Sequence, residues 1–240
     1  MPDRLDELEA AEKAARTNLQ PLRTLLRPSF EAADVLLRAY AGRFEIHDVP
    51  LPVGRVQRTL LTRFADDLRA AYLLGERGYA FQAMTMAATA LETGFAVAHI
   101  RFSERLAQRW LDWKDPHKAP WKVNDLISGA LEGDTSELTK GFRYWYTFFC
   151  WGKHANPLIQ APMEGVLTPE SFVIETDPEV TPVTTGRLYW CLNGALQLVP
   201  LVTKPLFEND PGDVTVPWRA LERLANEIQK LHVLKEPRTE

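Results

Sequence analysis

The sequence has few of the residues and motifs that build metal, disulfide or nucleotide-binding sites. Its two cysteines, Cys150 and Cys191, show no Cys-x-x-Cys or Cys/His spacing, so we expect reduced thiols packed as small apolar groups. The five histidines are scattered, without the His-x-x-x-His or Glu-x-x-His pattern of metal ligands. A phosphate-binding glycine loop and a Gly-x-Ser-x-Gly nucleophile turn are both absent. The sequence therefore predicts neither a metal nor a cofactor.

Targeting segments and concentrated charge are also missing. Residues 1–12 are charged from the third position and contain no apolar core, unlike a signal peptide. Residues 79–100 approach the length of a membrane span, but Gln82, Glu92 and His99 inside them would be costly in lipid. A formal net charge of -4 with both signs interspersed excludes broad binding to duplex nucleic acid and leaves room only for a local basic groove. We expect a cytoplasmic protein that does not contact a membrane.

Apolar residues recur at steps of three and four along most of the chain, which is typical of amphipathic helices. Residues 79–100 differ, because their apolar side chains would point in nearly every direction, as in the central helix of a bundle. The sequence therefore predicts an all-α protein, a multi-helix bundle around a central apolar helix. Residues 1–240 would form one domain, in which helices of 1–50 pack on a bundle of 55–235, with a short irregular or β-hairpin insertion near 165–183.

Individual residues predict where some helices begin. Pro21 would kink the first helix or start a second one there. Ser29 could cap a helix that runs to about Ala41, and Ser103 could cap a later one. The segment 48–52, with two prolines, is the clearest early break.

The few polar residues of the central helix fall on one narrow stripe. If Glu92 is buried there, it must find a cation or hydrogen-bond donors, and Arg63, Arg69 or an arginine from another helix are candidate partners. Glu92 and His99 would then belong to a ligand-binding site. A thin solvent-facing seam or a structural ion pair is the simpler interpretation, which we favour. The stripe consists of Gln82, Thr85, Thr89, Glu92, Ala96 and His99.

A second stripe lies in the aromatic-rich segment that ends at residue 157. Tyr146, Trp151 and Asn156 could form a stacking pocket for a flat ligand, with polar groups at its edge. Aromatic runs are more often ordinary core, and we place that interpretation first. The polar members of this stripe are Lys140, Arg143, Thr147, Cys150 and His154.

His154 has the strongest claim to catalysis. It follows Lys153 at the end of an expected helix, in a turn bounded by glycine and proline, where an imidazole could titrate and exchange protons. The alternative is a histidine that only hydrogen-bonds a loop carbonyl.

The run from Leu73 to Gly78, continuing through Glu92 to Trp110 and followed by 146–157, resembles an uncharacterised helical family of bacterial proteins. The resemblance covers about residues 60–157, and such proteins look distantly like HEPN domains, helical modules often found in RNA-cleaving toxins and phage-defence systems. It implies a metal-independent ribonuclease with RNA or a nucleotide as ligand. His154 would be the acid/base, Arg143 or Lys153 would stabilise phosphate charge, and two copies would form a homo-oligomer.

The sequence departs from the HEPN ribonuclease signature, in which four to six residues separate an arginine from a histidine. Arg143 and His154 are the nearest pair, and their eleven-residue offset places them about 16 Å apart along a helix. Within one chain they could not share a phosphate, although a symmetric dimer could bring them together. The competing hypothesis is a non-catalytic helical module that binds a ligand or a partner protein.

Overall fold

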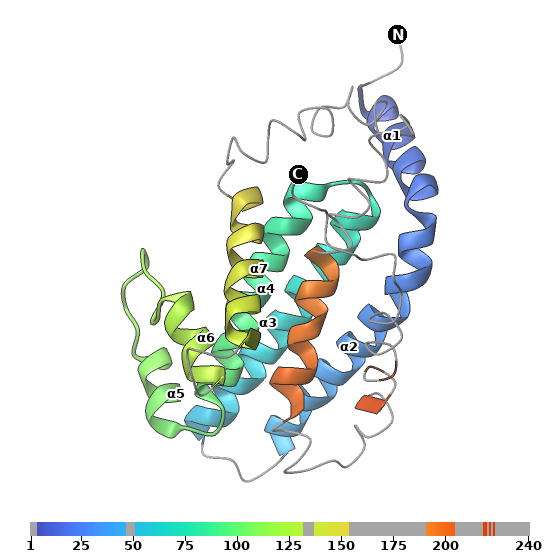
Figure 1. Cartoon of the computed structure of the whole chain (residues 1–240). Helices are drawn as coiled ribbons and strands as arrows, with labels where there is room; N and C mark the ends of the chain where they lie inside the picture. The colour runs from blue at the N-terminus through green and yellow to red at the C-terminus, as the bar shows by residue number, and fades with distance from the viewer. Residues whose placement is uncertain are drawn as a thin grey trace.

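The computed structural model describes residues 4–46, 51–131, 137–153 and 191–204, together with 218, 219, 221 and 223. Within these ranges the regular structure is helical, without strands, which confirms the all-α fold (Figure 1). The expected insertion near 165–183 lies outside the described residues. The labelled helices are α1 (Arg4–Asn18), α2 (Gln20–Ile46), α3 (Leu51–Glu76), α4 (Ala80–Ile100), α5 (Glu104–Leu111), α6 (Val123–Leu131) and α7 (Glu137–Lys153), and 191–204 are also helical.

Helix α4 is the central apolar helix that its composition predicts. Of its 21 residues, 15 are buried, and it packs against α3, α6 and α7. Small residues allow this close packing: a Cβ added at Gly94 would lie 2.5 Å from Leu198 and 3.0 Å from Phe64. Gly94 therefore forms a notch that receives a side chain from 191–204 on one side and from α3 on the other.

Helix α2 corrects one expectation about the early helices. It begins at Gln20, so Pro21 falls in the first turn, where proline is tolerated. The helix then continues through Pro28, and Ser29 is a buried residue inside α2 rather than a cap. The apolar stripe around this point is buried on both sides of Pro28, and this burial outweighs the lost backbone hydrogen bond. That stripe contains Leu22, Leu26, Phe30, Ala33 and Leu37.

The buried apolar residues form one core that runs from Leu19 to Leu221. The predicted single domain of 1–240 and its boundaries 1–50 and 55–235 include residues outside the described ranges, so they stay predictions. Among the described helices, none is long and apolar enough to span a membrane.

The junction between α4 and α5 is held by hydrogen bonds that fix where α5 starts. Gln57 of α3 donates to the carbonyls of Val97 and Arg101 at 3.1 and 2.7 Å, and these bonds provide donors for carbonyls at the end of α4 that are largely shielded from solvent. Arg101 donates to the carbonyl of Ala130 in α6 at 2.6 Å. Ser103 caps α5 as predicted, since its hydroxyl accepts from the Leu106 amide.

Candidate functional site

Three of the predicted site residues meet where α4 faces α7. Tyr146 Oη donates to Glu92 Oε1 at 2.8 Å, and Lys153 Nζ lies 3.3 Å from the same oxygen. The Glu92 and Lys153 side chains are 32% and 35% exposed, so the ion pair is in contact with solvent. Glu92 is thus the carboxylate around which a tyrosine and a lysine of α7 gather.

The other members of the α4 stripe show that it is a half-buried seam. Gln82 is exposed, whereas Thr85 and Thr89 donate to carbonyls one turn earlier in their own helix. The arginines expected to pair with Glu92 are engaged elsewhere, because Arg63 pairs with Asp67 and Arg69 with Asp34. The predicted partner was therefore wrong, and Lys153 takes that place.

Burial keeps the neighbouring hydroxyl and thiol neutral. It raises the pKa of Tyr146, and the hydrogen bonds of this hydroxyl to Cys150 and Glu92 raise it further. Burial also raises the pKa of Cys150, although Tyr146 and Lys153 act in the opposite direction. At neutral pH the cluster therefore contains no thiolate or phenolate nucleophile, and its charged part is the Glu92–Lys153 pair.

Arg143 does not join this cluster. Its Nη2 donates to Ser128 Oγ at 2.8 Å, so the guanidinium lies at the contact between α6 and α7. Arg143 also precedes Lys153 by ten residues, which is about 15 Å along the helix axis. The structure separates two of the three predicted catalytic residues within one chain.

His99 lies apart from Glu92, at the end of α4. Its ring contacts Trp121 edge-on with 5.3 Å between centroids, and it stands so close to Gly129 that a Cβ there would collide with it. Burial lowers the pKa of His99, the positive charge of Arg109 adds to this effect, and Asp125 opposes it. His99 is therefore a packed, neutral ring at pH 7, and the structure does not bring the two predicted ligand-binding residues of α4 into one site.

The remaining predicted residues cannot be placed. His154 and Asn156 lie outside the described residues, and only the backbone of Trp151 is described, as part of α7. Their proposed roles stay predictions. Across the described ranges, no group of three His, Cys, Asp or Glu side chains could hold a metal ion.

Residues 101–122, which we call the α5 arm, were not singled out by their sequence pattern. The arm contains six Lys or Arg and three Asp or Glu residues, a formal net charge of +3 in a chain of -4. In Figure 1 helix α5 and the loop after it stand at one edge of the bundle. Phe102 and Trp113 are 46% and 38% exposed. Trp113 Nε1 donates to the carbonyls of Asp115 and Lys118 at 3.1 and 2.6 Å, which fixes its ring.

Four of the six positive charges of the α5 arm have no carboxylate partner among the described residues. Many cations elsewhere in the described ranges have carboxylate partners, for example Arg38 with Asp34 and Asp66. Four exposed cations of the arm form no ion pair with any residue that the structure describes. They are Arg105, Lys114, Lys118 and Lys122.

The α5 arm is therefore a candidate nucleic-acid interface, because unpaired cations stand beside exposed rings. A local count of charge and aromatic residues would have found it in the sequence, whereas the net charge of the whole chain conceals it.

Comparison of the chain with protein-family models, with curated proteins and with solved structures found no match. A functional proposal must therefore rest on the residues themselves.

Proposed function

We propose that the protein binds single-stranded RNA through the α5 arm. The observation that carries the proposal is the exposed Trp113 ring, held in place by two hydrogen bonds, on the same arm as four cations that have no carboxylate partner in the described structure. A fixed ring loses little entropy when a base stacks on it, and unpaired cations can neutralise phosphates without first breaking an ion pair. The HEPN-like resemblance of residues 60–157 also supports RNA as the ligand.

Single-stranded RNA suits this surface better than a duplex. A net charge of +3 is modest, and the rest of the molecule is acidic, so backbone attraction alone would be weak. Exposed rings add affinity only where bases are unstacked and can lie against them. The expected binding is therefore salt-sensitive and tolerant of sequence.

The binding test uses fluorescence anisotropy with a labelled oligouridine at low salt. The double variant Lys114→Gln/Lys118→Gln removes two cations of the arm, and we expect the affinity to fall at least about tenfold. The control Lys13→Gln/Arg55→Gln removes the same charge from exposed positions on α1 and α3, and we expect a change below about twofold. Absence of wild-type binding, or equal losses in both variants, would contradict the proposal.

Cleavage of the bound RNA is a separate proposal, which concerns the end of α7. His154 would transfer protons as general acid/base, and Lys153 beside it would stabilise the negative charge that develops on the phosphate. The ion pair with Glu92 supports this assignment, because it holds Lys153 at a solvent-exposed position next to His154 in the sequence. Arg143 could contribute only from a second copy of the chain.

Binding without cleavage is the second candidate function, and two contacts favour it. Lys153 and Arg143 both have protein partners, Glu92 and Ser128, which is typical of residues that hold helices together. Incubation of total RNA with wild type and His154→Ala in the presence of a chelator separates the candidates. Cleavage that disappears in the variant supports the ribonuclease, whereas oligouridine binding without cleavage in either protein supports the non-catalytic module.

A further inference from the structure

A groove lies between α2 and α3, on helices that do not contribute to the α5 arm. Its volume is about 340 Å³, which is at the lower end of the range of small-molecule sites. Residues of both helices line it, and they are charged at the rim and apolar at the floor. They are Arg23, Arg27, Phe30, Glu31 and Asp34 from α2, and Ala65, Leu68, Arg69, Tyr72, Leu73 and Glu76 from α3.

The floor of the groove is apolar. The rings of Phe30 and Tyr72 lie 4.9 Å apart with an angle of 31° between their planes. Leu68 and Ala65 fill the space beside them and are almost fully buried. Such a floor favours a ligand with an apolar or aromatic body.

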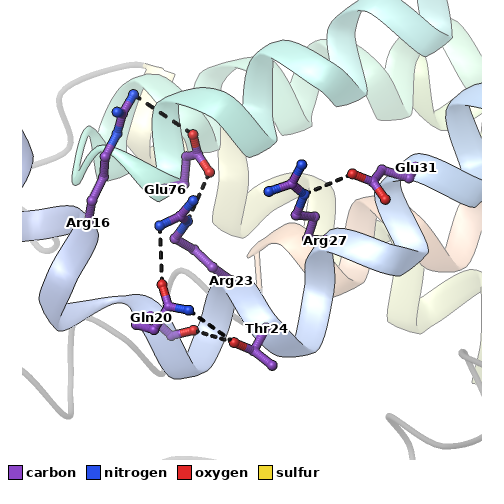
Figure 2. Close-up of polar contacts among 7 residues, drawn as sticks. All are labelled: Arg16, Gln20, Arg23, Thr24, Arg27, Glu31 and Glu76. Carbon is purple, nitrogen blue, oxygen red and sulfur yellow. Dashed lines mark hydrogen bonds and ion pairs between the residues drawn. The ribbon is translucent and has the colours of Figure 1, made fainter.

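The rim carries one fixed and one weakly held arginine, as Figure 2 shows. Arg23 is fixed, because Nε lies 3.1 Å from Glu76 Oε2 and Nη1 donates to Gln20, while Arg16 of α1 reaches the other oxygen of Glu76. Arg27 pairs with Glu31, one turn along its own helix, and both side chains are mostly exposed. Exposed pairs of this kind contribute little to stability, so Arg27 can exchange Glu31 for another anion.

Tyr72 supplies a buried donor that has no acceptor. Only 9% of its surface is exposed, and its Oη forms no hydrogen bond with any described residue. Burial raises the pKa of Tyr72 and the charge of Glu76 raises it further, whereas the Arg23 guanidinium lowers it through its contact with the hydroxyl and through its charge, and the charge of Arg27 also lowers it. The hydroxyl thus keeps its proton, and the two guanidinium groups beside it can only donate.

We infer that this groove binds a small organic anion whose carboxylate or phosphate oxygens accept hydrogen bonds from Tyr72 and Arg27 while its apolar body covers Phe30. The carboxylates that line the groove, Glu31, Asp34 and Glu76, are each paired with an arginine, and the Tyr72 hydroxyl has no acceptor among the described residues. An anion supplies that acceptor. To enter, the ligand displaces Arg27 from Glu31 and reaches the Tyr72 hydroxyl, which lines the same groove. The ligand gains two hydrogen bonds and an apolar surface, and only a weak exposed ion pair is lost.

The test measures binding of three probes to the full chain by calorimetry and thermal shift: benzoate, phenyl phosphate and inorganic phosphate. We expect saturable binding of benzoate or phenyl phosphate, and the tighter of the two identifies the anion as a carboxylate or a phosphate ester. Inorganic phosphate should bind at least about tenfold more weakly than phenyl phosphate, because it lacks the body that covers the floor. The inference would be overturned if neither aromatic probe binds at 10 mM. A dissociation constant of that size corresponds to a binding free energy of about 3 kcal/mol in magnitude.

Two substitutions locate the bound probe, each with a matched control. Tyr72→Phe and Arg27→Gln should each weaken the better probe at least about fivefold. The control for Tyr72→Phe is Tyr40→Phe, which removes a buried hydroxyl on α2 that also has no hydrogen bond among the described residues. The control for Arg27→Gln is Arg55→Gln, which removes an exposed charge from α3 outside the groove. Both controls should keep the wild-type affinity. Equal losses in variants and controls would also overturn the inference, and oligouridine binding should be unchanged in all four variants because the α5 arm is separate.

Discussion

Asp67 is a carboxylate inside the interface between α3 and α4, with only 2% of its surface exposed. It accepts hydrogen bonds from Arg63 Nε at 2.8 Å and from Thr93 Oγ1 at 3.0 Å. Burial raises the pKa of Asp67, and these two hydrogen bonds lower it without cancelling the effect. The negative charge is therefore held in the core at a cost in free energy, which the contacts reduce.

The sign of this pKa change gives a first prediction. A carboxyl group whose pKa is raised by folding stabilises the protein below its unfolded pKa, and this contribution is lost as the pH rises through the folded pKa. We expect Asp67→Asn to be more stable than wild type at pH 7, because Arg63 is largely exposed and is not left as a buried charge. The advantage should shrink towards pH 4 in urea denaturation, and a variant that is less stable at pH 7 would contradict the expectation.

His99 gives a prediction of the opposite sign. Burial lowers the pKa of His99 in the folded protein. The neutral ring therefore favours folding at pH values above the pKa of the unfolded chain. This stabilisation is lost as the pH falls from the pKa of the unfolded chain towards the lower pKa of the folded protein. We expect His99→Phe, which keeps a ring against Trp121, to lose less stability than wild type between pH 7 and pH 5. His117→Gln, at an exposed position, serves as the control and should follow the wild-type curve.

Helical periodicity could predict which side chains share a face, and for this reason Glu92 was found from the sequence, whereas Tyr146 was found from the aromatic density of its segment. It could not predict which cation would reach Glu92. Lys153 is 61 residues away in the sequence, and the choice between it and Arg63 depends on how α4 packs on α7 and α3. Pairs between helices are properties of the packed bundle, whereas stripes belong to one helix.

At the scale of elements, the contact between α4 and α7 contains a tyrosine whose contribution can be measured. Tyr146→Phe removes the hydrogen bond to Glu92 and should cost about 1 kcal/mol of unfolding free energy. Tyr144→Phe, on the same helix but exposed, should change stability by less than about 0.5 kcal/mol. Chemical denaturation of the two variants compares them directly, and equal effects would show that the bond does not stabilise the contact.

The notch at Gly94 predicts an asymmetry between two glycine substitutions in helices. Gly94→Ala places a methyl group 2.5 Å from Leu198 Cδ2, which should cost about 1–3 kcal/mol through overpacking. Gly42→Ala in α2 meets no atom within 4 Å, so the helix preference of alanine should stabilise the protein by about 0.5–1 kcal/mol. Thermal unfolding of both variants tests this, and a stabilised Gly94→Ala would show that the contact is looser than the structure has it.

The elements themselves were largely predictable from composition. Apolar residues on nearly every side identified α4 as the central helix, because such a helix is stable only where most of its surface is covered. The local signal failed at Ser29, where it predicted a helix start inside α2. The buried stripe that continues past it includes Leu26 and Phe30, and the free energy of that burial exceeds the preference of any single residue.

For the whole molecule, an uneven charge distribution predicts how the proposed RNA binding should respond to salt. Four unpaired cations of the α5 arm could contact about four phosphates, so the logarithm of the association constant should fall with the logarithm of salt with a slope on the order of -3. Measurement of the oligouridine association constant between 20 and 200 mM salt gives this slope. Over that range, a slope of this size corresponds to about a thousandfold fall in the association constant. A slope near zero would show that the proposed interface makes no phosphate contacts.

The α5 arm also shows why function was harder to predict than fold. Net charge is a sum over the chain, and the value of -4 conceals a positive segment of 22 residues. Whether its cations are free depends on which carboxylates fold near them, and that information is not local in the sequence. The same limit applies to the groove between α2 and α3, whose Tyr72 and Arg27 belong to different helices.

The notch at Gly94 has a consequence for synthesis of the protein on the ribosome. Leu198, which fills the notch, is synthesised 104 residues after the glycine that receives it. At typical elongation rates this interval lasts about 5–20 s. During this time α3 and α4 can pair, while the apolar side of α4 at Gly94 remains exposed to solvent. A nascent chain stalled before residue 198 should therefore be a preferred substrate of ribosome-associated chaperones.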